Sequence, residues 1–170
     1  LRQRLRNPDT IKEYRKQLKA LETEILEQMK GFYDQFEGEL DGHALTVDDL
    51  KNGSRGIGSY FHKLNNGILG NDIRNATVEN CLEDAKNWAT KTSPRYADII
   101  NLANSSLMQI LEDAEKLRSK NNLLLNSCRL SLQHLNKVQL LANIDEEVRQ
   151  LNHDNNRFLL SDTNALLHQL

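Results

Sequence analysis

Leucine and isoleucine recur every three or four residues along the second half of this chain. From Arg95 to Leu170 the sequence contains neither proline nor glycine, the two residues that most often end a helix. The spacing places an apolar stripe on one side of a helix over residues 96–117 and again over residues 124–158. Stripes with heptad spacing are typical of helices that pack against other helices.

Four polar residues, Ser119-Lys120-Asn121-Asn122, separate the two stripes, and we predict a turn there. A turn would fold residues 94–160 into an antiparallel hairpin. The alternative is one long helix, which would need a packing partner along its whole length because most helical stability comes from tertiary contacts.

The N-terminal half predicts a second amphipathic helix. Asn7-Pro8 has the form of a helix start, with a capping side chain followed by proline. Apolar residues then keep a spacing of three and four from Ile11 to Met29, and Phe32 and Phe36 continue it. We expect a helix of about 25–30 residues that ends near Gly38.

Residues 52–72 hold five of the eight glycines, so we predict one irregular loop region there, with a short helix over residues 59–64. Thr46-Val47-Asp48-Asp49 before it has the form of a capping box. Residues 73–89 predict a third helix. Thr92-Ser93-Pro94 predicts the start of the next one.

Together these patterns predict an all-α fold. Apolar residues make up 38% of the chain and aromatic residues 5%, which is low for a compact globular domain. We therefore expect an elongated antiparallel bundle of four to five helices with coiled-coil-like packing, built as a single domain over residues 1–170. Residues 161–170 predict the start of a further helix, so we expect the chain to be part of a larger protein.

The nearly equal numbers of basic and acidic residues limit the kinds of partner that the chain is expected to bind. Lysine and arginine number 22 and aspartate and glutamate 24, with no basic run of the kind that grips nucleic acid. No apolar run approaches the ~20 residues that cross a bilayer. We expect no nucleic-acid partner and no direct membrane insertion; the expected partner is another protein or a second copy of the chain.

No pattern in the sequence predicts an enzyme. The five histidines lack metal-ligand spacing, and the glycines of the irregular region do not match a phosphate-binding loop. Ser54 and Ser59 lie near His62, but nothing indicates an oxyanion hole or an orienting acid. We predict no catalytic residue, no metal and no cofactor. The leading hypothesis is a non-catalytic helical module that binds another protein or oligomerises.

The segment Phe61-His62-Lys63-Leu64-Asn65-Asn66 resembles the phosphoacceptor segment of histidine kinase dimerisation domains. The resemblance implies a phosphoacceptor role for His62, with Asn66 at the position of the family's asparagine and residues 99–117 as the returning helix. The glycines around this segment depart from the uninterrupted helix of that family. A second hypothesis is therefore a signalling domain, either a helical ligand sensor or a histidine phosphotransfer domain.

Five of the nine aromatic residues lie close together in sequence around the irregular region. Aromatic residues gathered in this way either close the end of a bundle or anchor a partner. We expect Phe32 and Phe36 to point inward, Tyr33 and Tyr60 to point outward, and Tyr33, Tyr60 and Phe61 to be the candidate partner-binding residues.

The sequence allows two interpretations of the two cysteines, Cys81 and Cys128. They are either small buried apolar side chains or, in an extracellular protein, a single disulfide. The disulfide gives a third hypothesis for function, a secreted helical binding protein stapled by Cys81 and Cys128.

Overall fold

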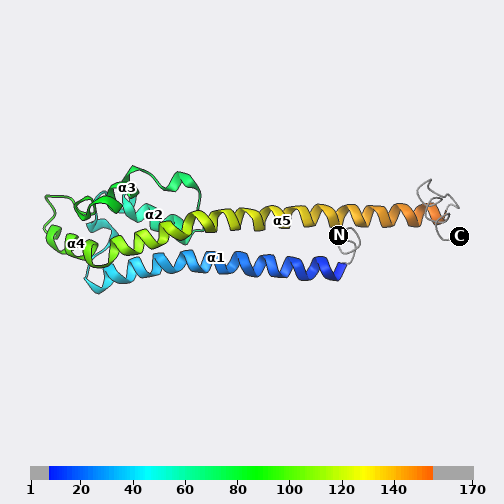
Figure 1. Ribbon diagram of the computed structural model, residues 1–170, viewed down its shortest axis with the longest axis horizontal. Helices are drawn as coiled ribbons and strands as arrows, with labels where there is room; N and C mark the ends of the chain where they lie inside the picture. Colours follow the sequence, from blue (N-terminus) through cyan, green and yellow to red (C-terminus); the bar gives the residue numbers. More distant parts are fainter. Residues whose placement is uncertain (1–7, 155–170) are drawn as a thin grey trace. The chain divides into compact units, whose positions relative to one another are not determined.

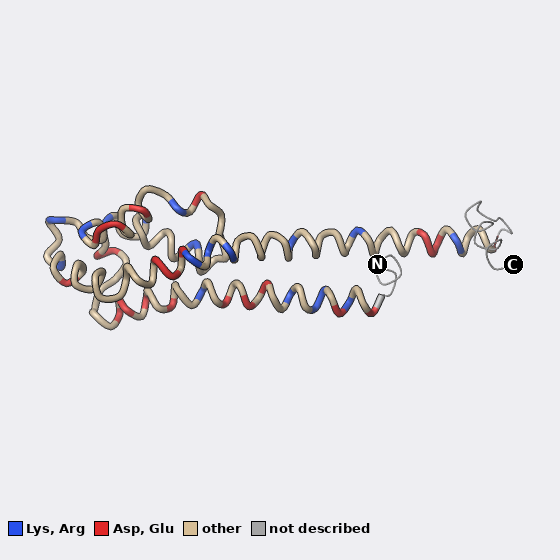
Figure 2. Tube along the Cα trace, in the orientation of Figure 1, with Lys and Arg blue, Asp and Glu red and all other residues tan. Residues whose placement is uncertain are grey.

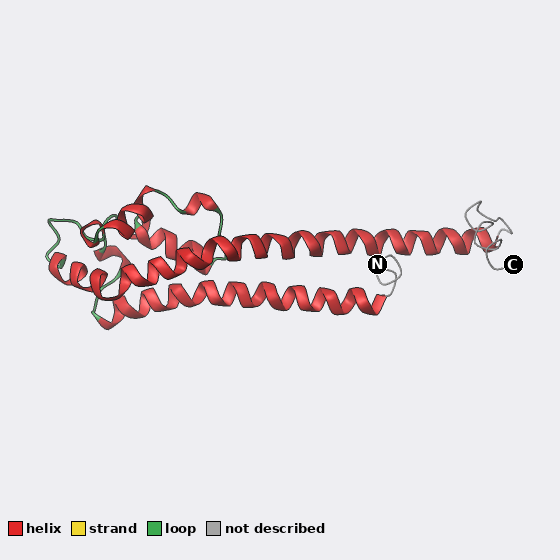
Figure 3. Cartoon of the chain, viewed as in Figure 1, coloured by secondary structure: helices red, strands yellow, loops and turns green. Residues whose placement is uncertain are grey.

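The structure is a computed structural model of the chain, and it describes residues 8–154 (Figure 1). Every regular element in this range is helical and none is a strand, which confirms the predicted all-α fold (Figure 3). The end of the apolar stripe at Phe158 and the expected helix start at residue 161 lie outside the described residues. The α-helices are α1 (Pro8–Gly42), α2 (Ile57–Asn65), α3 (Ala76–Glu83), α4 (Tyr96–Leu102) and α5 (Met108–Asp154).

The described residues group into two compact units. The larger unit comprises Lys19–Cys128, and the described part of the smaller unit comprises residues 8–18 together with residues 129–154. α1 and α5 each contribute residues to both units. The expectation of a single domain over residues 1–170 stays a prediction.

The predicted turn at residues 119–122 is wrong. α4 and α5 are joined by the π-helical segment η6 (Ala103–Leu107), and the helix continues from residue 96 to residue 154. Asn121 explains why the polar residues do not break it. Its side chain is buried and donates hydrogen bonds to Gln28 Oε1 at 2.8 Å and to Met29 Sδ at 3.2 Å, so a polar residue occupies a packing position.

Within the larger unit α1 and α5 run antiparallel. Asn121 of α5 contacts Gln28 and Met29, whereas Ser106, earlier in the chain, contacts Glu39, later in α1. The buried residues of α5 within this unit keep a spacing of three and four, as the heptad pattern predicted. They include Leu111, Ala114, Arg118, Asn121, Leu125 and Cys128.

Aromatic rings form the centre of this unit's core. Phe36 and Phe61 stack with their ring centroids 4.1 Å apart, and the edge of Tyr60 meets Phe61 at 5.3 Å. Phe36 points inward as expected, while Phe32 is only half-buried. Trp88 is fully buried, and its indole N–H donates to the carbonyl of Cys81.

The predicted third helix over residues 73–89 is broken at Asp84. α3 ends at Glu83, Asp84 is extended, and the 3₁₀ turn η5 (Ala85–Asn87) follows. The break lets the chain fold back, so that Trp88 reaches the carbonyl of Cys81 at 2.9 Å. Burial of the tryptophan decides the conformation here because helix propensity is a weak local preference.

The irregular region is confirmed as a set of short turns around α2. Three 3₁₀ turns accompany α2: η2 (Val47–Asp49), η3 (Gly53–Arg55) and η4 (Asn71–Ile73). The predicted capping box is present, since the backbone N–H of Thr46 donates to Asp49 Oδ2 at 2.8 Å. Glycine is needed at position 56, where a Cβ atom would lie 2.1 Å from the carbonyl oxygen of Lys51.

A buried cluster of polar side chains ties this region to α5. Arg118 donates two hydrogen bonds to Glu115, at 2.6 and 3.1 Å, and a third to the carbonyl of Leu69 at 2.9 Å. Tyr60 donates to the same carboxylate at 2.7 Å. The expectation that Tyr60 points outward is therefore wrong, because its hydroxyl finds a charged acceptor inside the core.

The smaller unit is a short antiparallel contact between the start of α1 and the later part of α5. Ile11, Leu18 and Leu135 are buried in it. Arg15 of α1 donates to Asn136 Oδ1 at 2.9 Å and to Gln139 Oε1 at 2.8 Å.

The aromatic core generates a first prediction. Phe36→Ala removes a fully buried, stacked ring and should lower the free energy of unfolding by about 3–5 kcal/mol. Tyr33→Ala, at a half-buried position on the same helix, should cost about 1 kcal/mol. Urea denaturation of both variants measures the two values. Equal losses would contradict the division between inward and outward rings.

Glu115 generates a second prediction. Burial alone would raise the pKa of Glu115, but hydrogen bonds from Arg118 and Tyr60 and the nearby positive charges outweigh it, so this pKa lies below its ordinary value. Glu115→Gln should cost about 1.5–3 kcal/mol of stability at neutral pH.

The pH dependence has a definite sign. Because the folded pKa is depressed, the carboxylate stabilises the fold above the ordinary glutamate pKa of 4.5, and this contribution disappears as the pH falls through the folded value. The stability difference between the natural chain and Glu115→Gln should therefore shrink below pH 4.5. Glu112→Gln, at an exposed position on the same helix, is the control. A difference that does not change with pH would refute a stabilising charge at Glu115.

Candidate functional site

A pocket of about 530 Å³ lies between α1, α2 and the turns that precede α2 in the larger unit. It collects two of the residues singled out in the sequence, Tyr33 and His62, and both serines that precede His62. It is lined by Tyr33, Glu37, Thr46, Val47, Asp48, Ser54, Gly58, Ser59, His62 and Lys63.

The packing of α2 decides which of its side chains reach the pocket. Ile57, Phe61 and Leu64 are buried, so the opposite side of the helix carries His62 and Lys63 outward. Gly58 lets the helix approach the turn before it, because a Cβ atom there would lie 2.3 Å from Val47 Cγ1.

The pocket carries charges of both signs. Glu37 and Asp48 supply carboxylates, and Lys63 supplies an amine. The rings of Tyr33 and His62 meet edge to face with centroids 6.4 Å apart. Burial and then the neighbouring Glu37 carboxylate raise the pKa of Tyr33, so its phenol stays protonated and can donate a hydrogen bond.

The structure assigns Asn66 a local structural contact. Its side-chain amide donates to the main-chain carbonyl of His62 at 3.0 Å and so caps the end of α2. The His62 side chain is exposed. α2 is nine residues long and ends at Asn65. A phosphoacceptor role for His62 stays a prediction.

The structure places the three predicted partner-binding residues in different surroundings. Tyr33 is half-buried at the pocket. Tyr60 is 2% exposed and Phe61 is not exposed at all, so the placement of these two on a binding surface is wrong. Both rings fill the core because α2 turns its apolar side toward α1 and α5.

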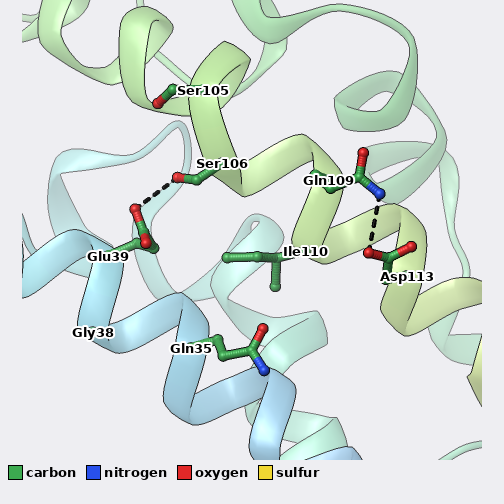
Figure 4. A pocket seen from close by; sticks show the side chains of 8 residues that line it. All are labelled: Gln35, Gly38, Glu39, Ser105, Ser106, Gln109, Ile110 and Asp113. Atoms are coloured by element: carbon green, nitrogen blue, oxygen red, sulfur yellow. Dashed lines mark hydrogen bonds between the residues drawn. The ribbon is translucent and has the colours of Figure 1, made fainter.

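A second pocket, of about 520 Å³, lies beside the π-helical segment (Figure 4). Ser106 donates from its hydroxyl to Glu39 Oε2 at 2.8 Å, and Gln109 donates to Asp113 at 3.0 Å, as the dashed lines show. Its wall is completed by Gln35, Gly38, Ser105 and Ile110. The Ser105 hydroxyl donates to the carbonyl of Leu102 at 3.1 Å, and Gln35 is exposed, so no buried polar group of this pocket indicates a ligand.

The smaller unit carries an apolar surface that sequence reasoning missed. The last stripe was expected to pack against another helix, but the structure leaves part of it exposed on α5. We name this surface the α5 apolar face and define it as Leu140, Leu141, Ile144 and Val148, with exposed fractions of 60, 65, 47 and 41%. The spacing predicted an apolar stripe, but it could not show which side of α5 would pack against α1.

The contacts of the smaller unit show why this face is exposed. Ile144 lies nine residues from the buried Leu135, and Val148 lies nine residues from Gln139, which meets α1, so each lies half a rotation of the helix away from the side that packs. Arg15 of α1 lies opposite Asn136 and Gln139 of α5. Pro8, the first described residue of α1, therefore lies at the level of residues 143–146, because antiparallel helices advance equally per residue. Figure 1 shows α5 continuing past this point.

The possible disulfide between Cys81 and Cys128 is not formed, since both are buried free thiols. The two thiols have different neighbours. Cys81 Sγ contacts the carbonyl of Asn87 at 3.8 Å, whereas Cys128 lies near Glu22. Burial raises the pKa of the Cys81 thiol to about 12.

Within residues 8–154 no group of three or more histidine, cysteine, aspartate or glutamate side chains is arranged to hold a metal ion. None of the helices there combines the length and the apolar character needed to cross a membrane.

The thiols generate a third prediction. At pH 8 the native chain should react slowly with a thiol reagent, because burial disfavours the thiolate of both cysteines. After denaturation two thiols per chain should react. Protein purified from its own compartment under non-reducing conditions is the sample to use. Fewer than two reactive thiols after denaturation would revive the disulfide hypothesis.

Comparisons with known proteins add no constraint to this geometry. No protein-family model, no curated protein and no solved structure matches the chain.

Proposed function

We propose that this chain is a non-catalytic interaction module that binds a partner helix through the α5 apolar face. The observation that carries the proposal is the run of exposed aliphatic side chains at heptad spacing, with Leu141, Ile144 and Val148 separated by three and four residues. A stripe of this kind on a helix is the seam by which helices associate.

Covering the α5 apolar face with a partner lowers the free energy, because it buries aliphatic side chains. Burying one leucine, isoleucine or valine side chain contributes roughly 1.5–3 kcal/mol relative to leaving it exposed. The face holds four such side chains on less than three turns of helix. Single exposed aliphatic residues are common, but contiguous exposed apolar patches mark interaction sites.

The other two hypotheses have less support. Histidine phosphotransfer through His62 rests on a resemblance of six residues, and the side-chain amide of Asn66, at the position of the family's asparagine, donates to the main-chain carbonyl of His62. The secreted, stapled binding protein would need a bond between Cys81 and Cys128, which are free thiols. A helical ligand sensor would use the pocket at Tyr33 and His62, but none of the residues that line it has a buried side-chain polar atom without a hydrogen-bond partner.

A photo-crosslinking amino acid placed on the face tests the proposal. Substitution of Ile144 by benzoylphenylalanine in cells that produce the protein should yield adducts with another chain after irradiation. The same amino acid at Glu146, which lies on the opposite side of α5, is the matched control and should yield few. Because Ile144 is about half exposed, Ile144→Asn should leave thermal melting nearly unchanged. Equal adduct yields from positions 144 and 146 would contradict the proposal.

A further inference from the structure

The α5 apolar face is bordered by acidic side chains. On an α-helix, residues three and four positions apart are neighbours, which places Asp145 beside Leu141 and Glu147 beside Ile144. Asp145 and Glu147 thus lie on opposite edges of the face. Figure 2 shows one acidic stretch near the C-terminal end of α5, on a trace that is otherwise mostly uncharged.

The positive charges nearby do not neutralise both edges. Arg149 forms an ion pair with Asp145 at 3.3 Å, and both side chains are about half exposed. The ion pair is therefore weak, and a cation of a partner can replace Arg149 beside Asp145. Lys137 lies one turn before Leu141 and bounds the face at that end. Between residues 140 and 154 the sequence has four carboxylates and one arginine.

We propose, as an extension of the proposed function and resting on it, that the partner is a basic amphipathic helix. Its apolar residues would cover Leu141, Ile144 and Val148, and its lysine or arginine side chains would lie against Asp145 and Glu147. In helix pairs, the residues that flank the seam set partner choice through interhelical ion pairs. Acidic flanks on this chain select basic flanks on the other.

A second copy of the chain fits the face less well. An antiparallel pair of copies would set each Asp145 near its counterpart and each Glu147 near its counterpart, so like charges would meet. A parallel pair would set Glu147 opposite Asn152 and Asp145 opposite Leu140, with no ion pair at either position. Charge complementarity therefore favours a basic helix over self-association.

Two designed helical peptides of about four heptads provide the probes, with identical leucines at the seam and either lysine or glutamate at every flanking position. Their binding to the full chain is measured by fluorescence anisotropy at low salt. We expect the lysine peptide to bind about tenfold or more tightly than the glutamate peptide, with a difference that falls as salt is added. Equal binding, or tighter binding of the glutamate peptide, would overturn the inference.

A matched pair of charge reversals separates the face from net charge. Glu147→Lys and Glu146→Lys change the charge of the chain equally, but Glu146 lies on the side of α5 away from the face. Glu147→Lys should reduce the preference for the lysine peptide about three- to tenfold, while Glu146→Lys should reduce it much less. Equal reductions by the two variants would show that overall charge, and not this face, selects the peptide.

A third variant distinguishes failure of this inference from failure of the proposed function. If both peptides bind without a charge preference and Ile144→Asn with Val148→Asn abolishes the binding of both, the interaction face stands and only the basic partner is refuted. If sedimentation shows that the chain dimerises through Ile144 and Val148, the partner is a second copy, and again only the basic partner is refuted. If neither peptide binds and the chain stays monomeric, both proposals fail.

Discussion

The buried carboxylate of Glu115 is the constraint on which the arrangement of the larger unit depends. It accepts hydrogen bonds from Tyr60 of α2 and from Arg118 of α5, and Arg118 in turn holds the carbonyls of Leu69 and Gly70. An ionised carboxylate and a guanidinium can be buried together only when their hydrogen bonds are satisfied. One side-chain pair on α5 therefore fixes both α2 and the turn that follows it.

The position of α2 decides the rest of the candidate pocket. With Tyr60 held inward, Phe61 stacks on Phe36 and the other side of the helix presents His62 to α1. The tight turn before α2 completes the wall, since Gly58 packs directly against Val47. The pocket is thus a by-product of core packing. Consistent with this origin, the polar side chains that line the pocket do not form one recognisable type of binding site.

The α5 apolar face has a different origin. The helix does not turn at residues 119–122 because Asn121 is satisfied by Gln28 and Met29, so α5 continues to residue 154. Steps of three and four residues from the buried Cys128 and Leu135 lead to Gln139, Ala142 and Glu146, whereas Ile144 and Val148 lie on the other side of the helix and are exposed. α5 therefore carries a second apolar side, which is able to receive another helix.

The sequence by itself determined the helical class, the amphipathic character of α1 and α5, the irregular region around α2 and the absence of a strand pattern. These follow from local rules, since the period of apolar residues and the positions of glycine and proline act over a few residues. Only the tertiary structure decided that Tyr60 is buried, that residues 119–122 stay helical, that Asp84 interrupts α3 and that the α5 apolar face is exposed. Three of these depend on a contact between residues distant in sequence: Tyr60 with Glu115, Asn121 with Met29, and Arg15 of α1 with the side of α5 opposite the α5 apolar face. The break at Asp84 depends on the burial of Trp88 in the core. Such contacts have no local signature because either partner alone is compatible with several environments.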